Sequence, residues 1–182
     1  MDFELSPKAK DYVKRTKAFI KNHIEPMEVD FWADVNAKQN HGDWTTWEVP
    51  AIVQELKAKA KAEGLWNMFL PCDKLGAGLS VMEYASVAEE TGRSLLAPTI
   101  FNCNAPDSGN MELLWRYGSD EQKATWLTQL LAGDIRSVFF MTEPDVASSD
   151  ATNMEATAIV EGDEVVLNGT KWWSSGVGDP HC

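Results

Sequence analysis

The chain has 182 residues, 44% of them hydrophobic, a length that fits one domain or two small ones with a buried core. Its formal net charge of −12 argues against nucleic acid as a partner, because phosphate contacts need clustered Lys and Arg. No stretch approaches the ~20 apolar residues of a membrane span. The N-terminal residues resemble neither a signal peptide nor a transit peptide, so a cytoplasmic location is expected, or an organelle matrix if a targeting segment was removed. The three cysteines have no paired or metal-ligand spacing, which predicts reduced thiols and no metal site.

The first two thirds of the sequence predict helices. Ser6 and Pro7 form an N-cap followed by a first-turn proline, and apolar residues then recur at helical spacing. This helix is expected to end near residue 24, before Pro26. Residues 30–46 are predicted to be a loop or a partly helical connection, anchored to the core by three tryptophans: Trp32, Trp44 and Trp47.

A second helix is predicted over residues 50–63 and ends at Gly64. Its core face is expected to carry Val53, Leu56 and Ala60, and its solvated side Lys57, Lys59 and Lys61. The glycines of residues 76–78 do not complete a dinucleotide-binding motif, because the third glycine and the preceding strand are missing. A turn entering the next helix is the preferred interpretation.

Two capping boxes predict the starts of later helices, Ser80 with Glu83 and Ser119 with Gln122. The first of these helices is expected to end near Gly92, and a helix over residues 108–117 is expected to end at Gly118. The last helix is predicted to end at Gly133. Its buried residues are expected to be Trp126, Leu127, Leu130 and Leu131.

The hydrophobic pattern changes period at Asp134. Residues 138–141 form a short apolar run, and residues 156–160 and 165–167 flank a turn at Gly162. A second hairpin turn is expected at Asn168 and Gly169, leading into residues 171–173. We therefore predict an α+β chain with a helical domain over residues 1–134 and the first strands of an antiparallel β domain over residues 135–182.

Five segments, in this order, resemble the acyl-CoA dehydrogenase family: residues 70–80, 88–94, 117–123, 139–150 and 168–176. The fourth contains Thr-Glu-Pro followed by a hydroxyl-rich loop, and the fifth contains Lys-Trp-Trp-Ser-Ser. The sequence of the hydroxyl-rich loop also resembles the branch of the family whose larger members carry a kinase-like domain. The resemblance implies a helical domain, a middle β domain and a C-terminal four-helix bundle, of which the bundle is absent from this chain.

The resemblance also implies the cofactor, FAD, and its contacts. The implied contacts come from the two last segments and are Phe139, Met141, Thr142, Ser148, Ser149, Trp173, Ser174 and Ser175. Trp173 is expected to form an apolar wall for the flavin ring, with Ser175 on the same face if the strand stays regular. Ser149 is implied to meet the acyl-CoA as well, although the serines at 148 and 149 are not separated by sequence. The family pattern has glycines where this chain has Asp145 and Ala147. A close approach of the loop backbone to a phosphate, which glycine allows, is therefore not predicted by the sequence.

The function implied is FAD-dependent α,β-dehydrogenation of an acyl-CoA thioester, with the catalytic base outside this chain and no catalytic residue assigned within it. The implied partners are the acyl-CoA substrate, an electron-acceptor flavoprotein, the missing C-terminal half or a second subunit, and further copies in a dimer or tetramer. Two alternatives stay open. One alternative to the dehydrogenase is a non-catalytic subunit or scaffold of a flavoprotein complex, and the other is an acyl-CoA oxidase or flavin monooxygenase of the same fold.

Overall fold

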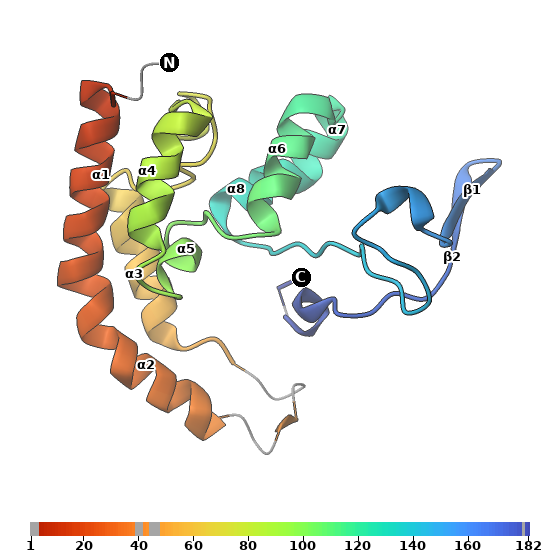
Figure 1. Cartoon of the computed structure of the whole chain (residues 1–182), viewed down its shortest axis with the longest axis horizontal. Helices are drawn as coiled ribbons and strands as arrows, with labels where there is room; N and C mark the ends of the chain where they lie inside the picture. The colour runs from red at the N-terminus through yellow and green to blue at the C-terminus, as the bar shows by residue number, and fades with distance from the viewer. Residues whose placement is uncertain (1–3, 39–41, 44–47, 180) are drawn as a thin grey trace. The chain divides into compact units, whose positions relative to one another are not determined.

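The structure is a computed structural model that describes residues 4–38, 42–43, 48–179 and 181–182 (Figure 1). The chain divides into two compact units, Met1–Asp134 and Ile135–Cys182. The first unit is helical and the second contains a two-stranded antiparallel sheet, which confirms the predicted α+β class. The helices of the first unit are α1 (Pro7–Phe19), η1 (Ile20–Ile24), α2 (Glu25–Lys38), α3 (Ala51–Ala62), α4 (Val81–Thr91), α5 (Ala97–Ile100), α6 (Asp107–Tyr117), α7 (Asp120–Gln122), η4 (Lys123–Leu127) and α8 (Thr128–Ala132).

The first helix does not end before Pro26, so that prediction is wrong. The helix begins as expected, with the Ser6 hydroxyl accepting the Ala9 N–H at 3.2 Å. Its path continues through the π-helical turn η1 into α2, where the N–H of Glu25 reaches back five residues to the carbonyl of Ile20. This turn shifts the hydrogen-bond register, so that Pro26 lies in the first turn of a new α-helical segment, where its missing N–H is tolerated.

The apolar core of the first unit is formed by side chains from α1, η1, α3, α4 and α5 and from the loop between α3 and α4. Phe19 and Phe101 meet edge to face with ring centroids 5.3 Å apart. α1 and α4 pack side by side, as Figure 1 shows. The predicted inward positions Val53, Leu56 and Ala60 are all buried. Each of these helices therefore buries one apolar stripe, and the contact between these stripes forms the core of the first unit.

Three side chains lie differently from the prediction. Lys57 is buried, because it shares a helix face with Val53 and its aliphatic stem packs along the core. Trp126 is 53% exposed, since the π-helical turn η4 alters the register, whereas Leu127 and Leu130 are buried as predicted. Trp32 also stays partly exposed, while Trp44 and Trp47 lie outside the described residues.

The local signals at helix ends are confirmed. Both capping boxes form: the Glu83 carboxylate accepts the Ser80 N–H at 3.0 Å, and the Gln122 side chain accepts the Ser119 N–H at 2.9 Å. Gly64 and Gly133 end their helices with φ of +67° and +76°, in the left-handed region that favours glycine. The stretch at residues 76–78 is the turn expected there, because no strand precedes it.

Two buried asparagines fix the C-terminal end of α8. Asn67 and Asn102 both adopt left-handed backbone conformations, with φ of +51° and +53°. The Asn102 amide donates to the Asn67 side chain at 2.8 Å and to the Leu130 carbonyl at 2.9 Å. The Asn67 amide donates to the Leu131 carbonyl at 2.9 Å. These bonds satisfy carbonyls that the last helical turn leaves without intrahelical partners.

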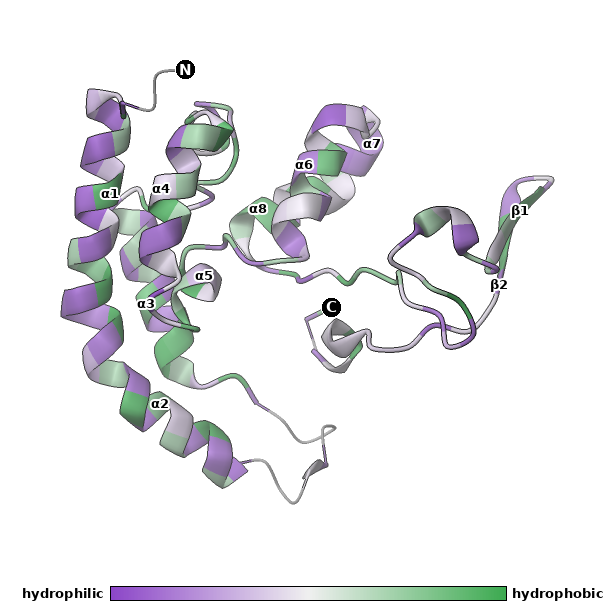
Figure 2. Cartoon of the chain, in the orientation of Figure 1, coloured by the Kyte–Doolittle hydropathy of each residue, from purple (hydrophilic) through white to green (hydrophobic). Residues whose placement is uncertain are grey.

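The second unit contains η5 (Ala151–Asn153), β1 (Thr157–Glu161), β2 (Glu164–Asn168) and η6 (Ser175–Gly178). β1 and β2 pair in antiparallel register from Thr157 opposite Asn168 to Glu161 opposite Glu164, which confirms the predicted hairpin. Figure 2 colours much of β2 as apolar, yet every residue of both strands is exposed. The hairpin therefore presents apolar surface on both faces.

The predicted strands at 138–141 and 171–173 are not strands in the described part of the chain. A strand needs a neighbour to complete its ladder, and the described backbone bond beside these segments runs from the Trp172 N–H to the carbonyl of Thr142, the residue after the first segment, at 3.1 Å. Trp173 has φ of +58°, and Ser175 begins η6. The alternation that would place these two side chains on one face is therefore interrupted, and that expectation is wrong.

Candidate functional site

The hydroxyl-rich loop after Thr142 is held by its own buried serine. The Ser148 hydroxyl accepts the Glu143 N–H at 2.7 Å and lies 3.2 Å from the Val146 carbonyl, to which it can donate. Ser148 is buried, whereas its neighbour Ser149 is exposed. The structure thus separates the two serines that the sequence left together: one supports the loop, and the other is open to a ligand. A cofactor contact by either residue stays a prediction.

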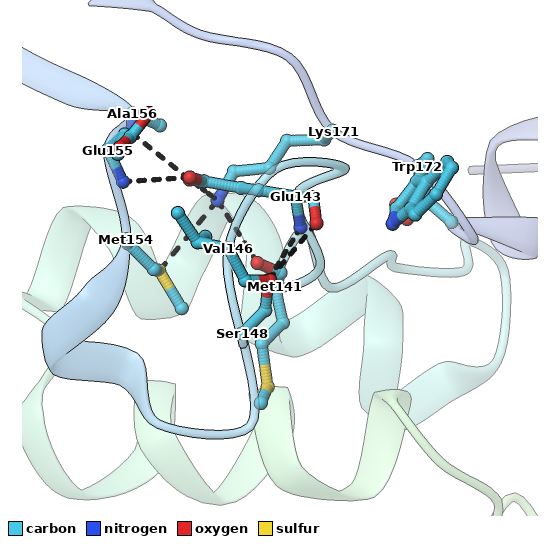
Figure 3. Close-up of polar contacts among 10 residues, drawn as sticks. Met141, Glu143, Val146, Ser148, Met154, Glu155, Ala156, Lys171 and Trp172 are labelled. Carbon is cyan, nitrogen blue, oxygen red and sulfur yellow. Dashed lines mark hydrogen bonds and ion pairs between the residues drawn. The ribbon is translucent and has the colours of Figure 1, made fainter.

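A partly buried ion pair joins this loop to the segment that carries the tryptophans (Figure 3). The Lys171 ammonium is 2.7 Å from the Glu143 carboxylate, and the two side chains are 20% and 6% exposed. The carboxylate also accepts the backbone N–H groups of Glu155 at 2.7 Å and Ala156 at 3.1 Å. The hydrogen bond from Lys171, with help from these N–H groups, lowers the pKa of Glu143 below its ordinary value of 4.5.

Lys171 connects more than one segment. Its ammonium also donates to the Met141 carbonyl at 3.2 Å and approaches the sulfur of Met154 at 3.7 Å. The next residue, Trp172, donates its N–H to Thr142. The two segments predicted to contact a cofactor therefore lie side by side, 28 residues apart in sequence at the ion pair.

The tryptophans of the second segment are presented to solvent. Trp173 is 79% exposed, and its ring centroid lies 5.6 Å from that of Trp172 at an interplanar angle of 58°. Phe139 is exposed as well, while Met141 and Thr142 are partly buried. Large exposed aromatics in a small unit mark a surface that a ligand or another polypeptide covers.

The serines after the tryptophans occupy a compact turn. Ser174 is partly buried and its hydroxyl donates to the Trp172 carbonyl at 3.3 Å, whereas Ser175 is exposed at the start of η6. The loop carboxylate Asp150 is a turn former, as its side chain accepts the N–H of Thr152 at 3.0 Å. The hydrogen bonds from Thr152 lower the pKa of Asp150 below its ordinary value of 3.8.

The residues present fit a flavin ring in part. Trp173 offers an apolar plane, and the N–H groups of Met141 and Thr142 meet no acceptor within the part of the chain that the structure describes. Residues 135–182 include two basic residues, Arg136 and Lys171, and eight acidic ones. Both basic side chains are paired, Arg136 with Asp179 at 3.9 Å. Cations for the phosphates of a dinucleotide would therefore come from outside this unit, or backbone N–H groups would replace them.

Sequence reasoning missed the Glu143–Lys171 pair. Both residues belong to the quoted segments, but Glu143 was read there only as part of Thr-Glu-Pro, and Lys171 only as the residue before the tryptophans. The available signal was the charge itself: each side chain stands beside an apolar run, and a charge buried there needs a partner. Among the described residues the structure shows no cluster of three metal-ligating side chains, and no helix long and apolar enough to cross a membrane.

Fold and site together define an α+β protein in which an exposed indole lies beside backbone N–H groups that meet no acceptor among the described residues. The sequence pattern of the acyl-CoA dehydrogenase N-terminal domain matches residues 6–134, and that of the acyl-CoA dehydrogenase middle domain matches residues 138–182. The chain belongs to the acyl-CoA dehydrogenase family. Acyl-CoA dehydrogenase family member 11 of Rattus norvegicus is 51% identical over 180 residues, which are 99% of this chain and 22% of the rat protein.

Solved structures agree. An acyl-CoA dehydrogenase homologue from Mycobacterium abscessus has 58% identity and a TM-score of 0.91, covering 98% of this chain and 45% of that one. A glutaryl-CoA dehydrogenase from Mycobacterium smegmatis, solved in complex with FADH2, has 26% identity and a TM-score of 0.65, covering 93% of this chain and 39% of that one. This chain therefore spans less than half the length of each of these relatives.

Proposed function

We propose that this chain supplies flavin and acyl-pocket contacts to an FAD-dependent enzyme that removes two hydrogens from an acyl-CoA thioester. Residues 1–134 serve as its N-terminal helical domain, and residues 135–182 as the beginning of its flavin-contacting β domain. Further polypeptide, in the same chain or in a second subunit, completes the β domain and supplies the catalytic base. An acyl-CoA, an electron-acceptor flavoprotein and further copies in a dimer or tetramer are the partners that go with this activity.

The observation that carries the proposal is that the segment ending at Thr142 and the segment containing Trp172 lie side by side. The end of the first, at Thr142, is hydrogen-bonded to the second at Trp172, next to the exposed Trp173. An aromatic wall and a hydroxyl beside open backbone donors are what a flavin ring needs from a protein. The membership of the chain in a family with an FADH2-bound structural relative supports the choice of ligand.

The residues of the two segments then have separate roles in binding and reducing the flavin. FAD bound here would supply a hydride acceptor for the β hydrogen of the substrate. Trp173 gives the ring an apolar wall and keeps water from one side of it. The Thr142 and Ser175 hydroxyls donate hydrogen bonds to ring atoms that become more negative on reduction, and the exposed Ser149 hydroxyl binds the phosphate or acyl part of a ligand. The α proton leaves to a base outside this chain.

The test uses the protein expressed from its complete coding region and loaded with FAD. Anaerobic mixing with acyl-CoA should bleach the visible flavin band, and Thr142→Val and Ser175→Ala should slow bleaching by about tenfold to 100-fold while leaving thioester binding nearly intact. An unaltered rate in both variants would contradict the tasks given to these hydroxyls.

The same material separates the alternatives. A protein that retains no FAD would be the scaffold or non-catalytic subunit. A reduced flavin that reoxidises rapidly in air would indicate the oxidase or monooxygenase. Slow reoxidation in air with rapid reoxidation by an electron-transferring flavoprotein would support the dehydrogenase.

A further inference from the structure

The Glu143–Lys171 pair is held by several hydrogen bonds inside the second unit. The carboxylate accepts from one ammonium and two backbone N–H groups, and the ammonium has two oxygen acceptors and a sulfur within reach. An ammonium carries three donors, and Lys171 has a protein partner within reach of each of them. Such a pair has one geometry, because any displacement breaks several contacts at once.

The contacts of the pair come from three separate pieces of chain. Glu143 belongs to the segment that ends at Thr142, Lys171 to the segment that carries Trp173, and the two N–H groups, at residues 155 and 156, to the stretch that enters β1. Figure 3 shows the carboxylate and the ammonium between these pieces. The neighbouring backbone also requires close approach: a Cβ at Gly169 would lie 2.6 Å from the Cβ of Ala156. The pair therefore sets the position of one segment against the other.

A buried ion pair is a poor source of stability, because removing two charges from water costs about as much as their attraction returns. The pair is better suited to fixing orientation: an apolar pair would fill the same space but would not fix the orientation of the backbone around it. The pair lies beside Thr142 on one segment and Trp172 on the other, and Thr142 and the adjacent Trp173 are residues proposed above to contact the flavin.

We propose that Glu143 and Lys171 are positioning residues for the flavin: without touching it, the pair sets the placement of Thr142 relative to the Trp173 indole, and so the affinity and environment of the bound ring. This inference rests on the proposed function. The pair takes no part in proton transfer, because its atoms are engaged with each other and with backbone groups behind the ligand-facing residues.

The test compares four variants with the wild type, each expressed from the complete coding region and titrated with FAD. Glu143→Gln and Lys171→Met each remove one charge and leave the other buried and unpaired. The double variant removes both charges with little change in volume and leaves no unpaired charge. Glu161→Gln, the same chemical change at an exposed residue at the end of β1, is the matched control.

Three quantities are measured: the FAD dissociation constant, the visible circular dichroism of the bound flavin, and the thermal midpoint of the apoprotein. Both single variants should bind FAD about tenfold or more weakly and change the dichroism, since small displacements of positioned groups are costly. The double variant should recover thermal stability relative to the single variants but keep the weakened binding and the altered dichroism. Glu161→Gln should match the wild type in all three.

Two results would overturn the inference. A double variant with wild-type affinity and dichroism would show that the pair is structural only. Single variants that lower the thermal midpoint and leave flavin affinity and dichroism unchanged would show the same. A wild-type protein that binds no FAD would instead refute the proposed function itself, and with it this inference, so the wild-type titration is done first.

Discussion

Replacing Trp173 with alanine separates binding from folding more cleanly than any other change in the second unit. The side chain is 79% exposed, so its removal should change the free energy of unfolding by less than about 0.5 kcal/mol. A buried tryptophan would cost about 3–5 kcal/mol instead. The structure therefore assigns the effect of this substitution to ligand binding.

The expected loss of binding follows from stacking. An aromatic side chain against a planar heterocycle contributes about 1–3 kcal/mol by alanine substitution. At 25 °C this corresponds to an FAD dissociation constant raised about 5-fold to 150-fold. The neighbouring hydrogen bond from the Trp172 backbone to Thr142 does not involve the indole of Trp173 and should survive.

The assay is a titration of apoprotein with FAD, followed by flavin fluorescence and the visible spectrum, beside a urea unfolding curve of each variant. Trp126→Ala is the matched control, because Trp126 is also exposed but belongs to the first unit. It should leave the affinity for FAD unchanged. Unchanged affinity and spectrum in Trp173→Ala would refute the assignment of this ring to the flavin, and a large loss of stability with intact binding would show that it packs in a core.

Three further changes test the fold. Ser148→Ala leaves the buried N–H of Glu143 without its acceptor and should lower the free energy of unfolding by about 1–3 kcal/mol, measured by urea denaturation; no change would mean that the serine does not hold the loop. Asn102→Ala should be less stable than Asn102→Gly by about 1 kcal/mol, because φ of +53° suits glycine and strains alanine; equal thermal midpoints would exclude strain there. The Ser6 and Ser80 hydrogen bonds lower the pKa of Glu83 to about 2 from 4.5, so its stabilisation is complete above pH 4.5 and lost as the pH falls toward 2. The difference in thermal midpoint between the wild type and Glu83→Gln should shrink over that interval, and a constant difference would argue against this linkage.

The sequence alone determined the features that depend on neighbours a few residues away. The capping boxes at Ser80 and Ser119, the left-handed glycine at the end of α8 and the turn between β1 and β2 all form from contacts within three or four positions. The family resemblance was also carried by short ordered segments, and the matches to the N-terminal and middle domains confirm it.

Tertiary structure decided the features that join distant parts of the chain. The burial of Lys57 depends on which face of α3 meets the core, and the register that turns Trp126 outward depends on a π-helical turn that has no clear signature in composition. The pairing of Glu143 with Lys171 spans 28 residues. A pattern read along the chain can show that each charge needs a partner, but only the folded backbone brings the two within 2.7 Å, because the cost of burying either charge is met when both arrive together.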